Sequence, residues 1–563
     1  WALRSESPRR PSFAERVVVD RVSIADERIM VTGQEGALLT GGEAVVRALE
    51  KQGVRHVFGI PGDHTVPIYG ALGASSIRHV TVRHEQGAGF IADGYARSSG
   101  QPAVAVTIGG PGLTNIATAL GEAYADGVPV LVVSADTPTS DLGAGRDYNH
   151  EMKDQRAALS AICAWSERVE THAQIPAAID RAFAGFATGR QRAIHIGIPI
   201  DILDTPGSVT PMTPAPRTLV SPDTADVCRA AALLRSAQRP VVLLGGGARG
   251  ARDAAARLAS VLAAPVMTTW SGIDAFPNDH PLWVGAGFHL QAAIDALTSA
   301  DVVLAVGTQL GRSDFWNGAV ELTSTVIRID LDPTQLNRNA TATVGLLGDA
   351  RLTLDALADE YRAPGTTDGS SRAAKMRRAV DTEADLTGIR YRPWLAAMRR
   401  GLPANAAIVA DSTLVTYRGF RYLPVPAEGR WLYPNAYGTL GYALPAAIGV
   451  GIAEPGRPAG VLIGDGGLLF TCPELLTASE QGLGIPVVVW NDRGYGCIRE
   501  GMRERGVTPL GVDFVIPNLS ALATAFGADY AAPRTPQALE AAVREAVAKT
   551  TPTLIEIDGR DAR

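Results

Sequence analysis

Two aspartates each follow an apolar segment that has the length of a buried strand. Asp465 interrupts "VLIGDGGLLF" (461–470), and Asp492 follows "IPVVVWN" (485–491). A buried carboxylate is costly unless a positive group meets it. Two carboxylates held close together repel, which favours uptake of a proton or binding of a cation. These residues therefore predict a cation site, provided that the fold brings Asp465 and Asp492 together.

The residues between the two aspartates predict a helix that joins two strands. Thr471 and Glu474 have the spacing of a capping box and Pro473 falls in the first turn, so we expect a helix from near Thr471 to near Gly482 or Gly484. A strand–helix–strand crossover makes its two strands parallel. Parallel strands end at the same edge of the sheet, where open α/β sheets bind ligands.

This edge would suit a diphosphate that is bridged by a metal ion. Carboxylate oxygens favour a hard ion such as Mg²⁺, which usually also binds phosphate oxygens. Gly466 and Gly467, next to Asp465, would let backbone N–H groups approach those phosphates. The alternative interpretation is a set of turn glycines beside two surface acids. The acid pair across a crossover favours the metal.

The rest of the chain predicts an α/β protein with about three domains. Its 563 residues are too many for one core, at roughly 150–200 residues per domain. Strand and helix patterns alternate throughout, which favours parallel sheets flanked by helices. Two polar segments, 204–224 and 362–378, are predicted to be linkers. The predicted limits are 1–35 for an N-terminal arm outside the fold, 36–205 for the first domain, 222–362 for the central domain and 384–563 for the last domain.

The first and last blocks share a local pattern. In "GYARSSGQPAVAVTIGGPG" (94–112) and in "GIAEPGRPAGVLIGDGG" (451–467), a helix of small residues leads through a Gly-x-Pro turn into an apolar strand and a glycine-rich loop. Any α/β protein repeats such units, which is the alternative explanation. The common spacing favours two related outer domains on either side of a central one.

Composition excludes several classes of protein. The chain is 46% hydrophobic and 20% charged with a net charge of −6, so nothing indicates a nucleic-acid partner. No apolar run reaches the roughly 18 residues of a spanning helix, so we expect no membrane partner. The four cysteines form no CxxC or Cys/His cluster, which argues against structural zinc and fits a cytoplasmic protein.

From residue 38 to 560 the sequence resembles the thiamine diphosphate (ThDP) enzyme superfamily, in its acetolactate synthase-like and 2-oxo acid decarboxylase branch. The shared motifs are the GDG and Asn-Asp pair described above, "RHEQGAG" (83–89) and "NAYGTLGYALPAAIG" (435–449). The resemblance implies a ThDP-binding fold with a pyrimidine-binding first domain and a diphosphate-binding last domain. It also implies that Asp465, Asp492 and the carbonyl of Gly494 bind Mg²⁺, although many members have asparagine at the second position.

The resemblance assigns roles to further residues. Glu85 would hydrogen-bond the aminopyrimidine of a cofactor held by another subunit and so activate its C2 carbon; the alternative is an acid favoured by the start of a helix. Leu440 would wedge under the two rings, and the carbonyl of Gly438 would accept a bond from the pyrimidine amine. The other implied cofactor contacts are Ser412, Thr413, Gly466, Gly467 and Tyr495. A shared cofactor implies a homodimer or a dimer of dimers.

Within the branch, the sequence is most similar to the 2-ketoarginine (5-guanidino-2-oxopentanoate) decarboxylases. The common stretches include "FGIPGDHT" (58–65) and "HEMKDQRAA" (150–158). The implied reaction is the ThDP- and Mg²⁺-dependent, non-oxidative decarboxylation of a 2-oxo acid to an aldehyde, and Asp63, His64 and His150 are the candidate proton relay. For a cationic substrate tail, Asp314 with Phe315 and Trp316 is a candidate clamp.

Two other functions stay open at this point. Pyruvate-type decarboxylases carry a glutamate where this chain has Ile498, which favours a carboligase that joins the decarboxylated 2-oxo acid to a second carbonyl. A catalytically silent ThDP-binding or regulatory subunit is the other alternative, and intact Glu85, Asp465 and Asp492 argue against it. FAD is not expected, because "GRSDFWNG" (311–318) departs from the Arg-Phe-Asp-Asp-Arg run of FAD-containing relatives and "LLGGGARGA" (243–251) lacks a clean dinucleotide fingerprint.

Overall fold

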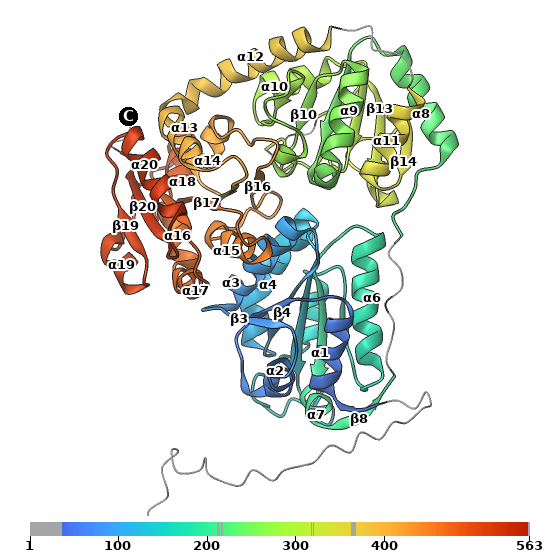
Figure 1. The fold of residues 1–563 in the computed structure, drawn as a ribbon, viewed down its shortest axis with the longest axis vertical. Coiled ribbons are helices and arrows are strands. Elements are labelled where there is room, and N and C mark those ends of the chain that lie inside the picture. The colour runs from blue at the N-terminus through green and yellow to red at the C-terminus, as the bar shows by residue number, and fades with distance from the viewer. Residues whose placement is uncertain are drawn as a thin grey trace, which may run out of the picture. The chain divides into compact units, whose positions relative to one another are not determined.

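The computed structural model describes residues 37–560 except 211–213, 215–217, 317, 319 and 362–367 (Figure 1). The N-terminal arm predicted at 1–35 lies outside these residues. The described part contains three six-stranded sheets whose strands are all parallel, and helices flank each sheet. The predicted fold class is therefore confirmed.

The first domain begins with a capped helix that follows a short strand. Thr40 accepts the N–H of Glu43, and the Glu43 carboxylate accepts the N–H of Thr40, as in a capping box. The sheet of this domain has the strand order β3-β2-β4-β5-β7-β6. Its elements are β1 Ala37–Thr40, α1 Gly41–Lys51, β2 His56–Gly59, η2 Asp63–Thr65, α2 Val66–Gly73, β3 Arg78–Thr81, α3 Glu85–Ser99, β4 Ala103–Thr107, α4 Pro111–Asp126, β5 Val130–Asp136, α5 Gln155–Ser160, β6 Ser166–Arg168, α6 Gln174–Thr188, β7 Ile194–Pro199, α7 Ile200–Asp204 and β8 Pro206–Val209.

The central domain has a different strand order, β11-β10-β9-β12-β13-β14. This is the order of doubly wound nucleotide-binding sheets. The glycine-rich turn after β9 packs against the turn after β12, because a Cβ on Gly245 would lie 2.3 Å from the carbonyl oxygen of Gly307. The elements are α8 Thr224–Ser236, β9 Pro240–Leu244, η3 Gly246–Ala251, α9 Arg252–Leu262, β10 Val266–Thr268, η4 Trp270–Ala275, β11 Trp283–Gly285, α10 Gln291–Thr298, β12 Val302–Val306, β13 Thr325–Asp330, η5 Pro333–Gln335, β14 Val344–Leu347 and α11 Ala350–Glu360.

The last domain repeats the topology of the first. Its order, β16-β15-β17-β18-β20-β19, matches the order of the first sheet strand for strand, which supports the two related outer domains predicted from the sequence. The elements are α12 Gly369–Gly388, η6 Ile389–Tyr391, α13 Arg392–Gly401, β15 Ala407–Ala410, α14 Leu414–Gly419, η7 Phe420–Tyr422, β16 Arg430–Leu432, α15 Ala443–Ala453, β17 Ala459–Gly464, α16 Asp465–Thr471, α17 Glu474–Glu480, β18 Pro486–Asn491, α18 Gly496–Glu504, α19 Leu519–Ala525, β19 Asp529–Ala531, α20 Pro536–Val547 and β20 Thr553–Asp558.

Both predicted linkers were wrong in part. Within 204–224, β8 pairs antiparallel with β1 and belongs to the first domain. Within 362–378, a helix starts at Gly369 and runs on to Gly388, and Figure 1 shows this long helix, α12, as the yellow ribbon that leads from the central to the last domain. Asp368 caps this helix through the N–H of Ser371, a signal that the basic composition of the segment obscured.

The helix predicted from near Thr471 to near Gly482 or Gly484 exists as α17, Glu474–Glu480, but its predicted start and capping box were wrong. Helix α16 already begins at Asp465, and a second helix, α17, begins at Glu474. The hydroxyl of Thr471 donates to the carbonyl of Gly441 at 2.7 Å and caps nothing. Glu474 instead turns to the first domain, where its carboxylate accepts the N–H groups of Arg83 and His84. A tertiary contact has displaced the local capping box.

The two outer domains share one core. Helices α3 and α15 meet with their backbones in contact: a Cβ on Gly94 would lie 2.1 Å from the carbonyl oxygen of Ala446, and a Cβ on Gly449 would lie 2.1 Å from that of Ile91. Buried residues of both sheets and of α3, α4 and α15 form a single hydrophobic cluster. The ends of the strands in the two domains are therefore held in a fixed relation within the chain.

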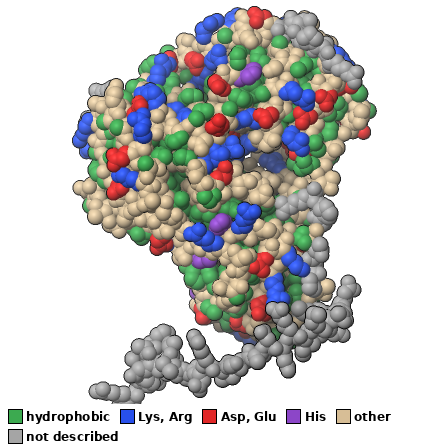
Figure 2. All heavy atoms as spheres, viewed as in Figure 1, with side chains coloured by type: hydrophobic (Ala, Val, Ile, Leu, Met, Phe, Trp, Pro, Cys, Tyr) green, Lys and Arg blue, Asp and Glu red, His purple; other side chains and the backbone are tan. Residues whose placement is uncertain are grey.

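Within the described residues, no helix is long and apolar enough to cross a bilayer. On the face that Figure 2 shows, Lys and Arg side chains are interspersed with Asp and Glu side chains.

A buried histidine in the first sheet predicts acid sensitivity. His195 in β7 is fully buried, and its ring nitrogens lie 2.9 Å from the Ser134 hydroxyl and 2.7 Å from the Ser166 hydroxyl. Burial lowers the pKa of His195 to about 3, below the value of about 6.5 in unfolded chains. Folding thus selects the neutral ring, so the stability that depends on it is complete above pH 6.5 and is lost as the pH falls toward 3.

As the pH falls from 6.5 to 5, we expect protonation of His195 in the unfolded chain to lower the free energy of unfolding by about 2 kcal/mol. A His195→Asn variant should show a shallower loss of stability over the same interval, because asparagine binds no proton there. Urea unfolding of both proteins across this pH range measures the two slopes. Parallel slopes would show that His195 does not titrate as expected.

Candidate functional site

Three neighbouring strands of the last sheet end at the predicted site. Strand β17 pairs in parallel with β15 on one side and with β18 on the other. Asp465 follows β17 directly, Asp492 follows β18, and Asp411 with Ser412 and Thr413 follows β15. The crossover argument is thereby confirmed, since both predicted aspartates lie at the same edge of one sheet.

The electrostatics of this edge favour a cation. Asp465 is 2% exposed, and one of its oxygens accepts the N–H of Gly494 at 2.8 Å. Burial raises the pKa of Asp465, and burial together with the charge of Asp465 raises the pKa of Asp492 to about 6. A divalent ion between the carboxylates would relieve both effects.

The available donors fit Mg²⁺. Across the described parts of the chain, no group of three or more His, Cys, Asp or Glu side chains could hold a metal ion. A metal ion at Asp465 and Asp492 therefore needs further oxygens from the main chain or from a ligand. Mg²⁺ commonly binds in this way, with one or two carboxylates and phosphate oxygens. The predicted carbonyl of Gly494 belongs to the turn that also donates its N–H to Asp465.

The other predicted cofactor residues gather around the start of α16. A Cβ on Gly464 would lie 2.7 Å from the Thr413 hydroxyl, and one on Gly466 would lie 2.7 Å from the ring of Tyr495. A Cβ on Gly467 would lie 3.1 Å from a carboxylate oxygen of Asp411. Ser412 is 7% exposed. The glycines thus let three loops meet closely at one edge, which suits a diphosphate between them.

The loop 433–442 carries Gly438 and Leu440 and is tied to this edge by an acid that the sequence argument missed. Asp411 is fully buried, and its carboxylate oxygens accept the N–H of Gly441 at 3.2 Å and the N–H of Ala443 at 3.0 Å. Burial raises the pKa of Asp411 to about 6. Its signal was available, since Asp411 follows the apolar run "AAIVA" just as Asp465 follows "VLIG".

Glu85 is the first residue of α3 in the first domain. It is 8% exposed, and its carboxylate accepts a hydrogen bond of 2.9 Å from the side-chain amide of Asn115. Asn115 lies on α4, so two helices position the carboxylate. Among the described residues Glu85 makes no hydrogen bond to the last domain. Its predicted role toward a cofactor held by a second subunit stays a prediction.

The three candidate relay residues lie together. The rings of His64 and His150 have their centroids 5.0 Å apart, although the two residues come from different loops. His64 is 6% exposed; burial and the neighbouring His150 lower its pKa, and the charge of Asp63 opposes them. His150 has a φ of 66°, and a Cβ on Gly110 would lie 2.5 Å from its carbonyl oxygen. This glycine therefore lets the loop approach closely.

The predicted clamp for a cationic substrate tail, Asp314 with Phe315 and Trp316, does not form one binding surface. Asp314 is 5% exposed and accepts a hydrogen bond of 3.1 Å from the side chain of Asn435, and burial raises its pKa to about 7. Phe315 packs on Phe288 in the core of the central domain. Of these three side chains, Trp316 alone is largely exposed.

Comparisons with known proteins agree with this geometry. Residues 39–158, 227–357 and 411–557 match the N-terminal TPP binding domain, the central domain and the C-terminal TPP binding domain of the thiamine pyrophosphate enzymes. A probable 2-ketoarginine decarboxylase of Pseudomonas aeruginosa is 41% identical, over 93% of this chain and 95% of the relative. A probable acetolactate synthase large subunit of Methanocaldococcus jannaschii is 30% identical over 92% of each chain, and the isozyme 3 large subunit of Escherichia coli acetolactate synthase is 32% identical over 82% of this chain and 84% of the relative.

All three domains are matched in order, and the similarity to the probable 2-ketoarginine decarboxylase extends over 93% of this chain. The edge with Asp465 and Asp492 lies in the C-terminal TPP binding domain, and Glu85 lies in the N-terminal one. The chain belongs to the thiamine pyrophosphate enzyme family.

Proposed function

We propose that the protein catalyses the non-oxidative decarboxylation of a 2-oxo acid to an aldehyde with ThDP and Mg²⁺, and that 5-guanidino-2-oxopentanoate is its substrate. One observation carries the proposal: the identity of 41% to a probable 2-ketoarginine decarboxylase extends over 93% of this chain. The clustering of acids at the strand edge and of histidines in the first domain supports it.

In this proposal each group of residues has one task. Asp465, Asp492 and the Gly494 carbonyl hold Mg²⁺, and Ser412, Thr413, Gly466, Gly467 and Tyr495 line the diphosphate. Leu440 and Gly438 orient the rings of the cofactor. When bound, ThDP supplies the carbon nucleophile and accepts the electrons released as carbon dioxide leaves.

The remaining residues handle protons. Glu85 exchanges a proton with the aminopyrimidine, and it does so across a subunit contact in a homodimer or a dimer of dimers. His64 and His150 lie close enough to share one proton path, and Asp63 is adjacent. We assign this group the delivery of a proton to the carbon that becomes the aldehyde.

A panel of 2-oxo acids tests the proposal. The enzyme with ThDP and Mg²⁺ is incubated with 5-guanidino-2-oxopentanoate, pyruvate, benzoylformate and a branched-chain 2-oxo acid, and the products are identified. Release of 4-guanidinobutanal from the first substrate at the highest kcat/KM supports the proposal. Aldehyde from another substrate alone would refute the substrate, and no decarboxylation at all would refute the activity.

The carboligase is a second candidate because of one side chain. Ile498 lies on α18 and is 55% exposed, in the position where pyruvate-type decarboxylases carry a glutamate. Without that acid the decarboxylated substrate has more time to meet a second carbonyl. A coupled product as the main species in the same panel would favour this candidate.

Trp316 supports a cationic substrate and gives a specific prediction. Trp316 is 51% exposed, and the centroid of its indole lies 4.5 Å from that of the stacked His289 ring and 5.7 Å from that of the Tyr417 ring. The backbone N–H of Tyr417 donates to the carbonyl of Thr413, a residue of the proposed diphosphate site. A guanidinium group on this face would gain a cation–π contact.

We expect Trp316→Ala to raise the KM for 5-guanidino-2-oxopentanoate about tenfold and to leave the KM for pyruvate nearly unchanged. Trp316→Phe, which keeps an aromatic face, should lie between the two. Steady-state kinetics with both substrates measure the difference. An equal change for both substrates would remove Trp316 from substrate selection.

A further inference from the structure

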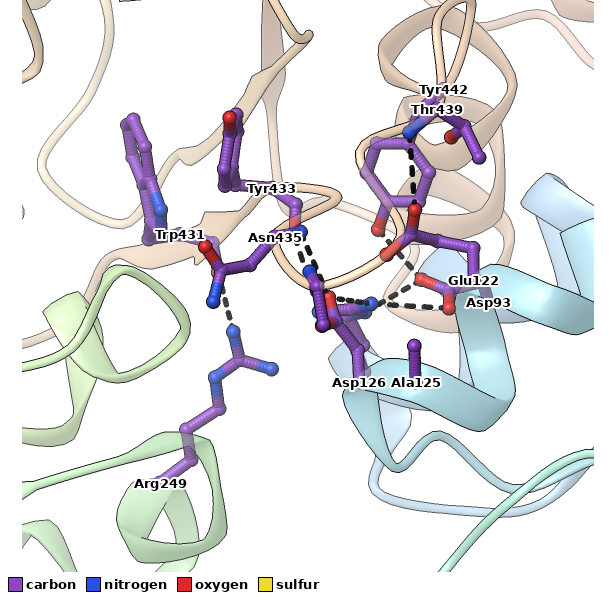
Figure 3. Close-up of polar contacts among 12 residues, drawn as sticks. Asp93, Glu122, Ala125, Asp126, Arg249, Trp431, Tyr433, Asn435, Thr439 and Tyr442 are labelled. Carbon is purple, nitrogen blue, oxygen red and sulfur yellow. Dashed lines mark hydrogen bonds and ion pairs between the residues drawn. The ribbon is translucent and has the colours of Figure 1, made fainter. Parts of the chain in front are cut away.

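The loop that carries Gly438 and Leu440 is anchored to the first domain as well as to its own sheet. At the end of α4, the Asp126 carboxylate accepts the N–H of Asn435 at 3.1 Å and the N–H of Ala436 at 3.0 Å. Figure 3 shows Asp126 facing this turn from the first domain. The start of the loop is thus fixed by a carboxylate from another domain of the same chain.

Glu122 holds the centre of the same loop. It lies four residues before Asp126 on α4, and its Oε2 atom accepts the N–H of Thr439 at 3.3 Å (Figure 3). Thr439 stands between Gly438 and Leu440, and the φ angles of Gly438 and Gly441 are 71° and 80°. The backbone is therefore irregular here, and no helix or strand ladder holds the N–H of Thr439.

The surroundings of Glu122 contain more acids than bases. Arg97 lies between Asp93, at 2.6 Å, and Asp126, at 3.0 Å, and the Tyr442 hydroxyl donates to Asp93 at 2.6 Å. All these side chains are buried, and one arginine balances two aspartates only in part. Glu122 makes no ion pair of its own among the described residues.

The surroundings of Glu122 favour the uncharged form of its carboxyl group. It is 0% exposed, and burial, followed by the charge of Asp126, raises its pKa well above the usual range, although Arg97 opposes this. Its Oε2 atom accepts the Thr439 N–H, whereas Oε1 has no hydrogen-bond partner in the described residues. An amide of the same shape could replace such an acid, whereas an apolar side chain could not.

We propose that Glu122 is a positioning residue that fixes the peptide between Gly438 and Leu440 for cofactor binding. It acts through the N–H of Thr439 and touches no reacting atom. This proposal rests on the proposed function, in which Gly438 and Leu440 orient the cofactor. It assigns part of the cofactor-binding geometry of the last domain to a side chain of the first domain.

Three variants test the proposal on the full-length protein. Glu122→Gln keeps the acceptor, Glu122→Leu keeps the volume without it, and Glu545→Gln removes an exposed acid of α20 as a matched control. Equilibrium titration with ThDP and Mg²⁺, followed by tryptophan fluorescence, gives the dissociation constant of ThDP. Hydrogen–deuterium exchange of the apo proteins gives the protection of the Thr439 amide.

We expect Glu122→Leu to weaken ThDP binding about tenfold, because the Thr439 N–H is left without an acceptor, and to speed exchange at Thr439 more than at Asn435 and Ala436. Glu122→Gln and the control should bind as the wild type does. Unchanged affinity and unchanged exchange in Glu122→Leu would overturn the proposal.

The wild-type protein alone offers a second test, which does not depend on the folding of a variant. A Thr439 amide that exchanges as fast as an exposed amide in the apo wild type would overturn the proposal. Failure of the wild type itself to bind ThDP would instead overturn the proposed function, so the two failures can be told apart.

Discussion

A Glu85→Gln enzyme is expected to decarboxylate its substrate about a thousandfold more slowly than the wild type and to bind ThDP almost as tightly. Glutamine can occupy the buried position at the start of α3 and can still meet Asn115, which donates to Glu85 at 2.9 Å. It cannot exchange a proton with the aminopyrimidine. The loss should therefore fall on kcat, while the dissociation constant of ThDP changes little.

Two measurements separate this expectation from a structural defect. Hydrogen–deuterium exchange at the C2 carbon of bound ThDP reports activation of the cofactor directly and should slow in parallel with kcat. Asn115→Ala is the matched control, because it removes the partner of Glu85 and leaves the acid, and it should have a much smaller effect. Full turnover by Glu85→Gln would remove the catalytic assignment of this residue.

Asp465→Asn is expected to weaken the Mg²⁺-dependent binding of ThDP at least about a hundredfold, since the loss of a direct ligand should exceed the effect of losing an outer-shell partner. Asparagine keeps an oxygen that can accept the Gly494 N–H, which Asp465 accepts at 2.8 Å, so the fold of the edge should persist. The change removes one negative charge from the metal site. Titration with Mg²⁺ at fixed ThDP, and with ThDP at saturating Mg²⁺, measures both affinities.

Asp492→Asn provides the comparison. Many enzymes that the sequence resembles have asparagine at this position, so this variant should retain binding within about tenfold of the wild type. The two substitutions are chemically identical and lie at neighbouring strand ends. Equal losses in both variants, or tight binding by Asp465→Asn, would contradict the proposed division of roles at this edge.

The sequence predicted those parts of the site that depend on local order along the chain. An apolar run, an acid and a crossover helix were enough to bring Asp465 and Asp492 to one edge, because right-handed crossovers leave parallel strands with their ends aligned. His64 and His150 were assigned to one site on a different basis. Their assignment depended on the resemblance to known enzymes, and nothing in the spacing of 86 residues between them predicted rings with centroids 5.0 Å apart.

The contacts between domains could not be predicted in this way. Glu474 has the spacing of a capping residue for Thr471, yet its carboxylate binds N–H groups of the first domain. Glu122 and Asp126 look like ordinary polar positions of a helix, and their partners lie more than 300 residues later. Such long-range hydrogen bonds leave no periodic trace in the sequence, so propensity and spacing favour the local alternative.

The close crossing of α3 and α15 limits how this enzyme could be recombined with its relatives. A methyl group on Gly94 or Gly449 would lie 2.1 Å from a carbonyl oxygen of the facing helix, so a chimera that imports either outer domain alone must also import a matching surface. The central domain has a sheet of its own, but Trp270, Ile273 and Ala286 belong to a hydrophobic cluster of the last domain, so an exchanged central domain would also need a matching surface. We therefore expect the first and last domains to have diverged together in evolution, as one unit.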